Sequence, residues 1–154
     1  MNQYRGGTVR IPVNYSKSSK GESIFVTARL LAPHVSGYVD LIVDTGCPFS
    51  FIGAIDVEKL NIKVAGKRPV EDIQWGDKIL RFFPFHGSEL WFRAENDGVE
   101  KPHVIRHKKL RATLDFVAVK ERKDSPNVLG MDFLSDNNLQ LVVDGKTKSA
   151  WFEA

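Results

Sequence analysis

The sequence has little cysteine and no long hydrophobic run. Cys47 is the only cysteine, which excludes an intrachain disulfide and removes the Cys-rich zinc patterns. No segment approaches the roughly 18 apolar residues that span a bilayer, and the first residues hold no apolar run typical of a signal peptide. We therefore expect a cytoplasmic protein that has no membrane partner.

Several motifs that bind cofactors or perform catalysis are also missing. The sequence contains no phosphate-binding Gly loop and no Ser-centred elbow, and no internal repeat or low-complexity tract occurs. His103 and His107 are four residues apart, but in an extended strand they would lie roughly 13 Å apart, and no Glu follows in register. The sequence predicts no metal site and no cofactor.

The excess of positive charge is small and local. The formal net charge is +3, and the segment Lys101–Arg111 holds five Lys or Arg residues and two His. Aromatic residues, which alternate with basic ones in many nucleic-acid patches, are absent from this segment. We interpret it as a solvated surface ribbon whose lysines discourage edge-to-edge strand pairing, and we expect no nucleic-acid partner.

What the sequence does contain is the pattern of an all-β globular domain. Apolar residues make up 42% and charged residues 27% of the chain, which is ordinary for a water-soluble domain, and we expect one domain over residues 1–154. Runs rich in β-branched and aromatic residues recur between Gly, Pro, Asn and Asp. They predict strands over residues 8–15, 23–31, 38–45, 50–53, 71–76, 78–87, 88–94, 113–120, 139–145 and 149–153.

Helical signal is scarce. Two short helices are predicted, over residues 54–62 and 131–138. Hairpin turns are predicted at Gly76-Asp77 and at Asp144-Gly145. The polar segment Arg93–His103 is predicted to be an exposed loop inserted between strands.

One acid stands at the end of an apolar strand. Alternation sends Val39, Leu41 and Val43 to one face of the strand, so that Asp44 lies on the other. Gly46 allows a tight turn, and Thr45 adds a hydroxyl that can reach a backbone group. By itself the tripeptide is more typical of a structural turn than of a site.

The order of the neighbouring segments changes this interpretation. An apolar strand runs into Asp-Thr-Gly, a second strand and a short helix follow, and much later the segment Asn127–Leu134, "NVLGMDFL", opens a helix before a last hairpin. This ordered set resembles the retropepsin-like aspartic peptidases over about residues 38–62 and 115–145. The resemblance implies an all-β, closed β-barrel of the acid protease fold with one or two short helices, a flap hairpin and a two-fold homodimer.

The chemistry explains why such a turn holds an acid. Hydrolysis of a peptide bond by activated water needs a base and an acid, and two carboxylates about 3 Å apart supply both because they share one proton. Only one Asp-Thr-Gly occurs, and we interpret "NDG" at Asn96–Gly98 and "VDG" at Val143–Gly145 as turns. The second carboxylate is therefore predicted to be Asp44 of a second copy in an isologous homodimer.

The resemblance also implies roles for individual residues. Thr45 would hydrogen-bond across the two-fold axis, and the Gly46 carbonyl would contact a peptide or protein substrate. The flap would be the segment 71–82. The terminal segments, residues 8–13 and 149–153, would form an interface sheet. The residues expected to bind substrate are Trp75, Gly76 and Asp77 near the flap tip, with Cys47, Pro48 and Val128; Trp75 is equally consistent with a core aromatic residue.

Two positions depart from the family pattern. After Asp-Thr-Gly, family members prefer a small residue and then commonly Ser, Thr or Asp, whereas this chain has Cys47 and Pro48. Pro48 has no N–H to offer to a substrate, and with Met131 it replaces an acid–Arg pair of retroviral members. The leading prediction is an aspartic endopeptidase. The alternative is a module of the same fold that binds peptides or proteins without cleaving them.

Overall fold

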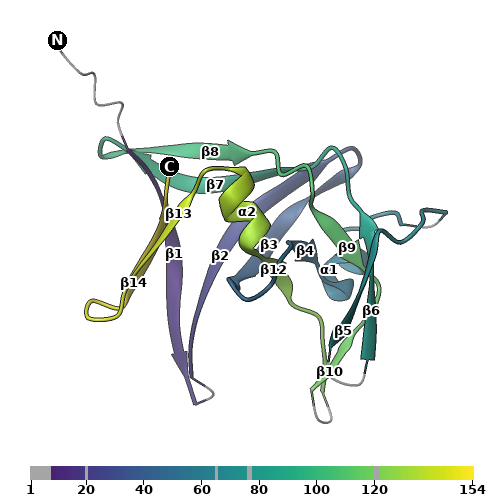
Figure 1. Cartoon of the computed structure of the whole chain (residues 1–154). Helices are drawn as coiled ribbons and strands as arrows, with labels where there is room; N and C mark the ends of the chain where they lie inside the picture. Colours follow the sequence, from purple (N-terminus) through teal and green to yellow (C-terminus); the bar gives the residue numbers. More distant parts are fainter. Residues whose placement is uncertain (1–7, 20, 65, 76–77, 120–121) are drawn as a thin grey trace.

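The computed structural model describes residues 8–19, 21–64, 66–75, 78–119 and 122–154. These residues form strands and two short helices (Figure 1). Their bounds are β1 (Val9–Ser18), β2 (Gly21–Ala32), β3 (Val35–Val43), β4 (Phe51–Ile52), α1 (Ala54–Lys59), β5 (Glu71–Trp75), β6 (Lys78–Pro84), β7 (Glu89–Asn96), β8 (Val99–Ile105), β9 (Arg111–Thr113), β10 (Val117–Val119), β11 (Arg122–Asp124), β12 (Asn127–Leu129), α2 (Met131–Asp136), β13 (Gln140–Asp144) and β14 (Ser149–Glu153).

Most strands belong to one curved sheet. Its order is β13-β14-β1-β7-β2-β3-β12-β4-β9-β6-β5, and β8 pairs with β7. The ends of this sheet, β13 and β5, lie on opposite sides of the molecule and do not pair in the described part of the chain (Figure 1). The prediction of a closed barrel is therefore wrong. In the described part of the chain, β10 and β11, next to β5 and β6, pair with each other and form a separate two-stranded sheet (Figure 1).

The core lies on the concave face of this sheet and around α2. Alternation along β3 is as predicted, because Leu41 is fully buried whereas Asp40 and Ile42 are exposed. Leu30 of the neighbouring β2 is also fully buried. Phe133 of α2 is also fully buried, and its ring lies 5.8 Å from those of Phe92 and Phe152. Helix α2 is thus fixed against β7 and β14.

Both helices begin at the predicted residues, but each ends two or three residues earlier than predicted. Gly53 and Gly130, both extended, precede α1 and α2. Asn61 and Asn138 have φ of 55° and 51° shortly after the helices end, a left-handed conformation that Asn adopts more readily than most residues. No helix in the described ranges is long and apolar enough to cross a membrane.

The segment predicted as an exposed loop, Arg93–His103, is instead a hairpin, so that prediction is wrong. Strand β7 continues to Asn96, which pairs with Val99 of β8. Asp97 and Gly98 between them have φ of 50° and 78°, as two-residue hairpin turns require. The prediction of a turn at Asn96–Gly98 is confirmed, but its consequence for the flanking strands was missed.

Candidate active site

The Asp44 turn lies where three strands meet. Strand β12 lies between β3 and β4, parallel to β3, with Leu129 opposite Val43, and antiparallel to β4. The Asp44 amide donates to the Leu129 carbonyl at 3.0 Å, which extends the ladder by one bond. The connection of residues 44–50, called the Asp44 loop below, therefore joins the two strands on either side of β12.

The backbone of the turn orients the Asp44 carboxylate. The Gly46 amide donates to Asp44 Oδ1 at 2.9 Å, and the Cys47 amide donates to the Asp44 carbonyl at 3.1 Å. Asp44 is half-buried, while Thr45 and Gly46 are exposed. The other carboxylate oxygen makes no hydrogen bond with any described residue. One oxygen is thus held by the turn and the other is available to a partner.

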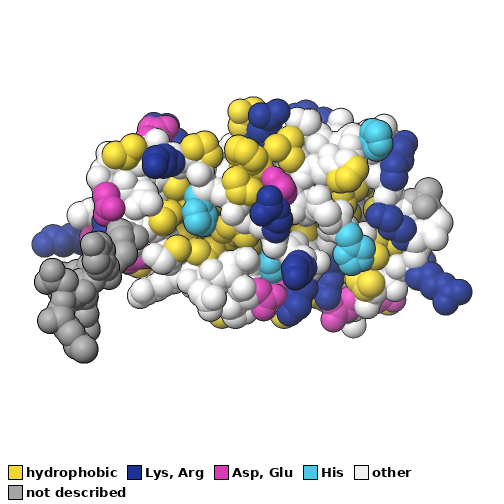
Figure 2. Space-filling view, turned by 90° about the horizontal axis from the view of Figure 1, so that it is seen from above, with side chains coloured by type: hydrophobic (Ala, Val, Ile, Leu, Met, Phe, Trp, Pro, Cys, Tyr) yellow, Lys and Arg dark blue, Asp and Glu magenta, His cyan; other side chains and the backbone are white. Residues whose placement is uncertain are grey.

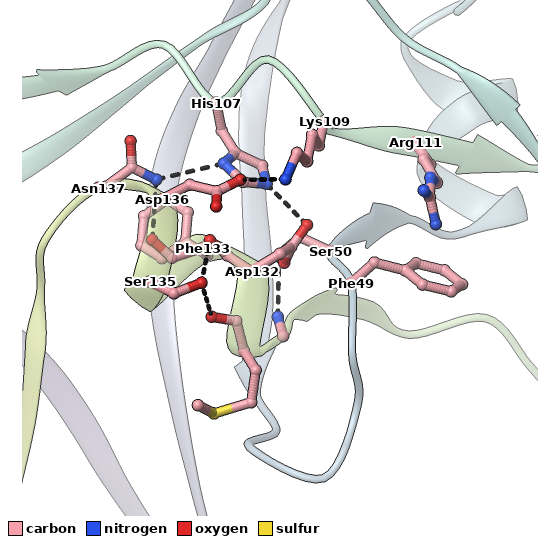
Figure 3. Close-up of polar contacts among 12 residues, drawn as sticks. Phe49, Ser50, His107, Lys109, Arg111, Asp132, Phe133, Ser135, Asp136 and Asn137 are labelled. Atoms are coloured by element: carbon pink, nitrogen blue, oxygen red, sulfur yellow. Dashed lines mark hydrogen bonds and ion pairs between the residues drawn. The ribbon is translucent and has the colours of Figure 1, made fainter.

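A polar network links the end of the Asp44 loop to α2 (Figure 3). The Gly130 amide donates to Ser50 Oγ at 2.9 Å, and Ser50 Oγ donates to Asp132 Oδ1 at 2.7 Å. Asp132 Oδ2 lies 2.9 Å from His107 Nε2. The side chains of His107 and Asp132 are 1% and 10% exposed, so these contacts are largely shielded from water.

Two opposing effects act on Asp132. Burial by itself would raise the pKa of its carboxyl group, but hydrogen bonds from His107 and Ser50 outweigh burial, and the pKa lies below its ordinary value. Asp132 is therefore a carboxylate that accepts from both partners. This network could not be predicted, because no sequence pattern links positions 50, 107 and 132.

The network is not a nucleophilic triad, although it contains Ser, His and Asp. In such a triad the His takes the Ser proton, whereas here Ser50 donates to Asp132 and is fully buried. A metal site is not formed either, since the described residues contain no group of three or more His, Cys, Asp or Glu that could hold an ion. The network is suited to hold the loop in place.

Gly130 is needed for the close approach of the Asp44 loop to α2. A Cβ atom built at Gly130 would lie 2.5 Å from the Phe49 carbonyl oxygen and 2.6 Å from that of Cys47. The Met131 amide also donates to the Cys47 carbonyl at 2.8 Å. The Gly of "NVLGMDFL" is thus required because backbone packs directly on backbone.

Comparison with solved structures identifies the fold. No protein-family model matches the chain, and no curated protein matches it in sequence. The chain is similar to the crystal structure of a retropepsin-like aspartic protease from Rickettsia conorii, with a TM-score of 0.52, 16% sequence identity, and coverage of 95% of this chain and 98% of that chain. The chain has a retropepsin-like fold. At this identity the similarity shows the fold alone.

In this retropepsin-like fold, β5 and β6 form the hairpin in which the flap was predicted. Their pairing runs to Trp75 opposite Lys78, but Gly76 and Asp77, predicted at the tip, lie outside the described residues, as does the side chain of Trp75. At the base of the hairpin, Arg111 pairs with Glu71. The Arg111 guanidinium also lies 4.2 Å from the centre of the Phe49 ring, which ties the hairpin to the Asp44 loop (Figure 3).

The other residues predicted to bind substrate differ in exposure. Pro48 is exposed, whereas Cys47 and Val128 are 6% and 2% exposed in a small cluster with Phe51 and Phe82. Burial raises the pKa of the Cys47 thiol, which makes it a poor nucleophile. A role for these three residues in substrate binding stays a prediction.

The basic segment Lys101–Arg111 begins in β8, which pairs with β7 and with no other strand in the described ranges. Several of its cations are paired: Arg106 with Glu89, and Lys109 with Asp136, each at 3.0 Å. From the side of β7 and β8, Lys and Arg side chains are interspersed with acidic and hydrophobic ones (Figure 2). The positively charged side chains on this face do not form one continuous patch.

Proposed function

We propose that this protein is an aspartic endopeptidase that uses Asp44 from each of two copies. The observation that carries the proposal is the position of Asp44: in a retropepsin-like fold, it lies at the end of β3 with one carboxylate oxygen held by the Gly46 amide. An exposed turn that presents an oriented carboxylate is what acid–base activation of water needs.

In the proposed mechanism, the two carboxylates lie about 3 Å apart and share one proton. The ionised carboxylate takes a proton from water, which attacks the peptide carbonyl, while the protonated carboxyl donates its proton to the carbonyl oxygen. The tetrahedral intermediate then collapses, and the amine leaves with a proton from the dyad.

The second carboxylate comes from a second copy because each chain has one Asp-Thr-Gly turn. Thr45 is exposed, and its hydroxyl makes no hydrogen bond with the described residues. We assign it to a bond across the two-fold axis. In an isologous dimer, two-fold symmetry places the same turn of each copy at the axis, so no second Asp-Thr-Gly is needed in the chain.

The proposed sheet contact between copies involves β13. The two terminal segments predicted to form the interface, in β1 and β14, pair with each other within one chain, with Arg10 opposite Glu153. Because β13 covers the other side of β14, the outer edge of β13 has no partner strand among the described residues and can receive one. Val143 on β13 is 48% exposed, which suits a contact with a second copy.

The proposed substrate is an extended peptide or an exposed segment of a protein. It would lie between the Asp44 turns and the β5–β6 hairpin, where backbone hydrogen bonds give affinity and side-chain pockets give specificity. Trp75, Gly76 and Asp77 would cover it, with the hairpin acting as a flap. Pro48 would contact it without donating a backbone hydrogen bond.

The alternative is a peptide-binding module of the same fold that does not cleave. Both functions use the same surface, so cleavage itself must be measured. Asp40→Asn is a suitable control, because Asp40 lies on β3, the strand that leads into Asp44, and its exposed side chain accepts from Thr27.

The test is cleavage of a mixed peptide library between pH 3 and 7 by the wild type, Asp44→Asn and Asp40→Asn. We expect cleavage by the wild type and Asp40→Asn, and its loss in a folded Asp44→Asn variant. Peptide binding without cleavage by the wild type would support the binding module. Undiminished cleavage by Asp44→Asn would remove Asp44 from the mechanism.

A further inference from the structure

We propose that His107 is a positioning residue that holds the Asp44 loop in its active geometry through Asp132 and Ser50. The kinetic part of this inference rests on the proposed function; the structural part does not. Among the described residues, no hydrogen bond or ion pair joins His107 to Asp44, Cys47, Pro48 or Val128. Its effect must therefore be transmitted through the contacts drawn in Figure 3.

The orientation of the His107 ring is set by Asn137. Asn137 Nδ2 donates to the Phe133 carbonyl at 2.8 Å and lies 3.2 Å from His107 Nδ1. Because an amide NH₂ group can only donate, Nδ1 is the acceptor, and the ring carries its hydrogen on Nε2. That hydrogen points to Asp132 Oδ2, 2.9 Å away.

The ring cannot leave this position easily. His107 packs edge-on against Phe133, with 5.6 Å between the ring centres, and both residues are buried. Asp132 is thereby held at both oxygens, since Oδ2 accepts from His107 and Oδ1 accepts from Ser50. Loss of the His107 donor would leave a shielded carboxylate oxygen without a partner, and rotation of the carboxylate toward water would release Ser50.

Ser50 connects this network to the catalytic turn. It is the last residue of the Asp44 loop, and its hydroxyl also accepts from the Gly130 amide. The residues on either side of Gly130 hold the start of the loop, because the Leu129 carbonyl accepts from the Asp44 amide and the Met131 amide donates to the Cys47 carbonyl. The segment 129–131 therefore fixes both ends of the loop, and His107 fixes that segment through Asp132 and Ser50.

Three variants test the role of the donor. His107→Phe keeps a ring against Phe133 and removes the hydrogen bond, whereas His107→Gln places an amide donor near the position of Nε2. Ser50→Ala breaks the same network at its other end with little change in volume. Asp136→Asn is the control, because Asp136 lies on the same helix but pairs at the surface with Lys109.

Two readouts are compared, amide hydrogen exchange and the kinetics of peptide cleavage. In His107→Phe and Ser50→Ala we expect exchange of the Asp44, Gly130 and Met131 amides to rise about tenfold or more, while amides in β2 and β3 keep their protection. We expect kcat to fall at least about tenfold with KM changed by less than about twofold, because a misplaced catalytic group acts on the reaction step. His107→Gln and Asp136→Asn should stay near the wild type in both readouts.

Unchanged exchange of these amides in His107→Phe would overturn the proposal, as would a rise spread evenly over β2 and β3, which indicates general destabilisation. If His107→Phe does not fold, unchanged exchange in Ser50→Ala overturns it. The proposal would also be overturned if His107→Gln changed exchange and cleavage as much as His107→Phe does, because a donor at the position of Nε2 would then have no effect. The exchange measurement does not depend on catalysis. If the wild type cleaves no peptide, the proposed function is wrong, but exchange still tests whether His107 holds the Asp44 loop.

Discussion

Ser50 and Asp132 are 82 residues apart in the sequence, and their side chains meet at 2.7 Å. This contact joins the loop that leaves the Asp44 turn to the first turn of α2. The loop and the helix are therefore one structural unit, together with β12 between β3 and β4. The rigidity of the Asp44 turn depends on residues that the tripeptide itself does not reveal.

The first prediction concerns the close contact at Gly130. Gly130→Ala should lower the free energy of unfolding by about 2 kcal/mol or more, because its Cβ would meet the carbonyl oxygens of Phe49 and Cys47. Urea denaturation measures the change. The matched control is Gly145→Ala, since a Cβ there meets nothing within 4 Å, and it should change stability by less than about 0.5 kcal/mol. Equal effects of the two variants would contradict the packing described here.

The second prediction concerns Asn127, which connects three segments. Its Oδ1 accepts from the Gly53 amide at 2.7 Å, and its Nδ2 donates to the Asp40 carbonyl at 3.1 Å and to Asp56 Oδ2 at 2.5 Å. Asn127→Ala should cost about 3 kcal/mol in thermal or urea unfolding, because these groups lose their partner in a buried place. Asn14→Ala, at an exposed strand position, should cost far less. A loss below about 1 kcal/mol in Asn127→Ala would show that water replaces the amide.

The third prediction concerns the pH dependence of stability. The pKa of Asp132 is lowered by folding, so its contribution to stability is complete above its ordinary value of about 3.8 and is lost as the pH falls through the lower folded pKa. At pH 5, Asp132→Asn should be less stable than the wild type by about 2 kcal/mol, because Asn places an NH₂ donor against one of the two donors from which Asp132 accepts. This difference should shrink below pH 3.8.

Chemical denaturation at pH 5 and at pH 2.5 measures this difference. Asp136→Asn is the control, because its partner Lys109 is 62% exposed, and such surface pairs contribute less than about 1 kcal/mol. A difference between wild type and Asp132→Asn that grows as the pH falls would have the wrong sign and would contradict the role assigned to Asp132.

Much of the fold could be predicted from local patterns. Alternation placed Leu41 in the core and Asp40 outside, and the Asp144-Gly145 turn does join β13 to β14. Strand β12 was not predicted, since three buried residues, Asn127–Leu129, carry no alternation. The open sheet was missed because closure depends on whether distant edges meet, and no local pattern reports this.

The candidate site was predicted only in part. Asp44, Thr45 and Gly46 could be found because they are contiguous and follow an apolar strand. The His107 network could not, since its members come from the Asp44 loop, the segment before β9, and α2, and only the folded chain brings them together. His107 had been considered as a metal ligand with His103, a pairing that spacing alone suggested and extended geometry excluded.

The central claim is that one catalytic site needs Asp44 from two chains, and mixed dimers test it most directly. Wild-type protein is unfolded and refolded with a tenfold excess of Asp44→Asn, and peptide cleavage per wild-type chain is measured. If two chains share the site, random pairing leaves about one-tenth of the wild-type chains in wild-type dimers, and cleavage should fall about tenfold. Cleavage per wild-type chain that is unchanged by the excess variant would show that one chain suffices and would contradict the account.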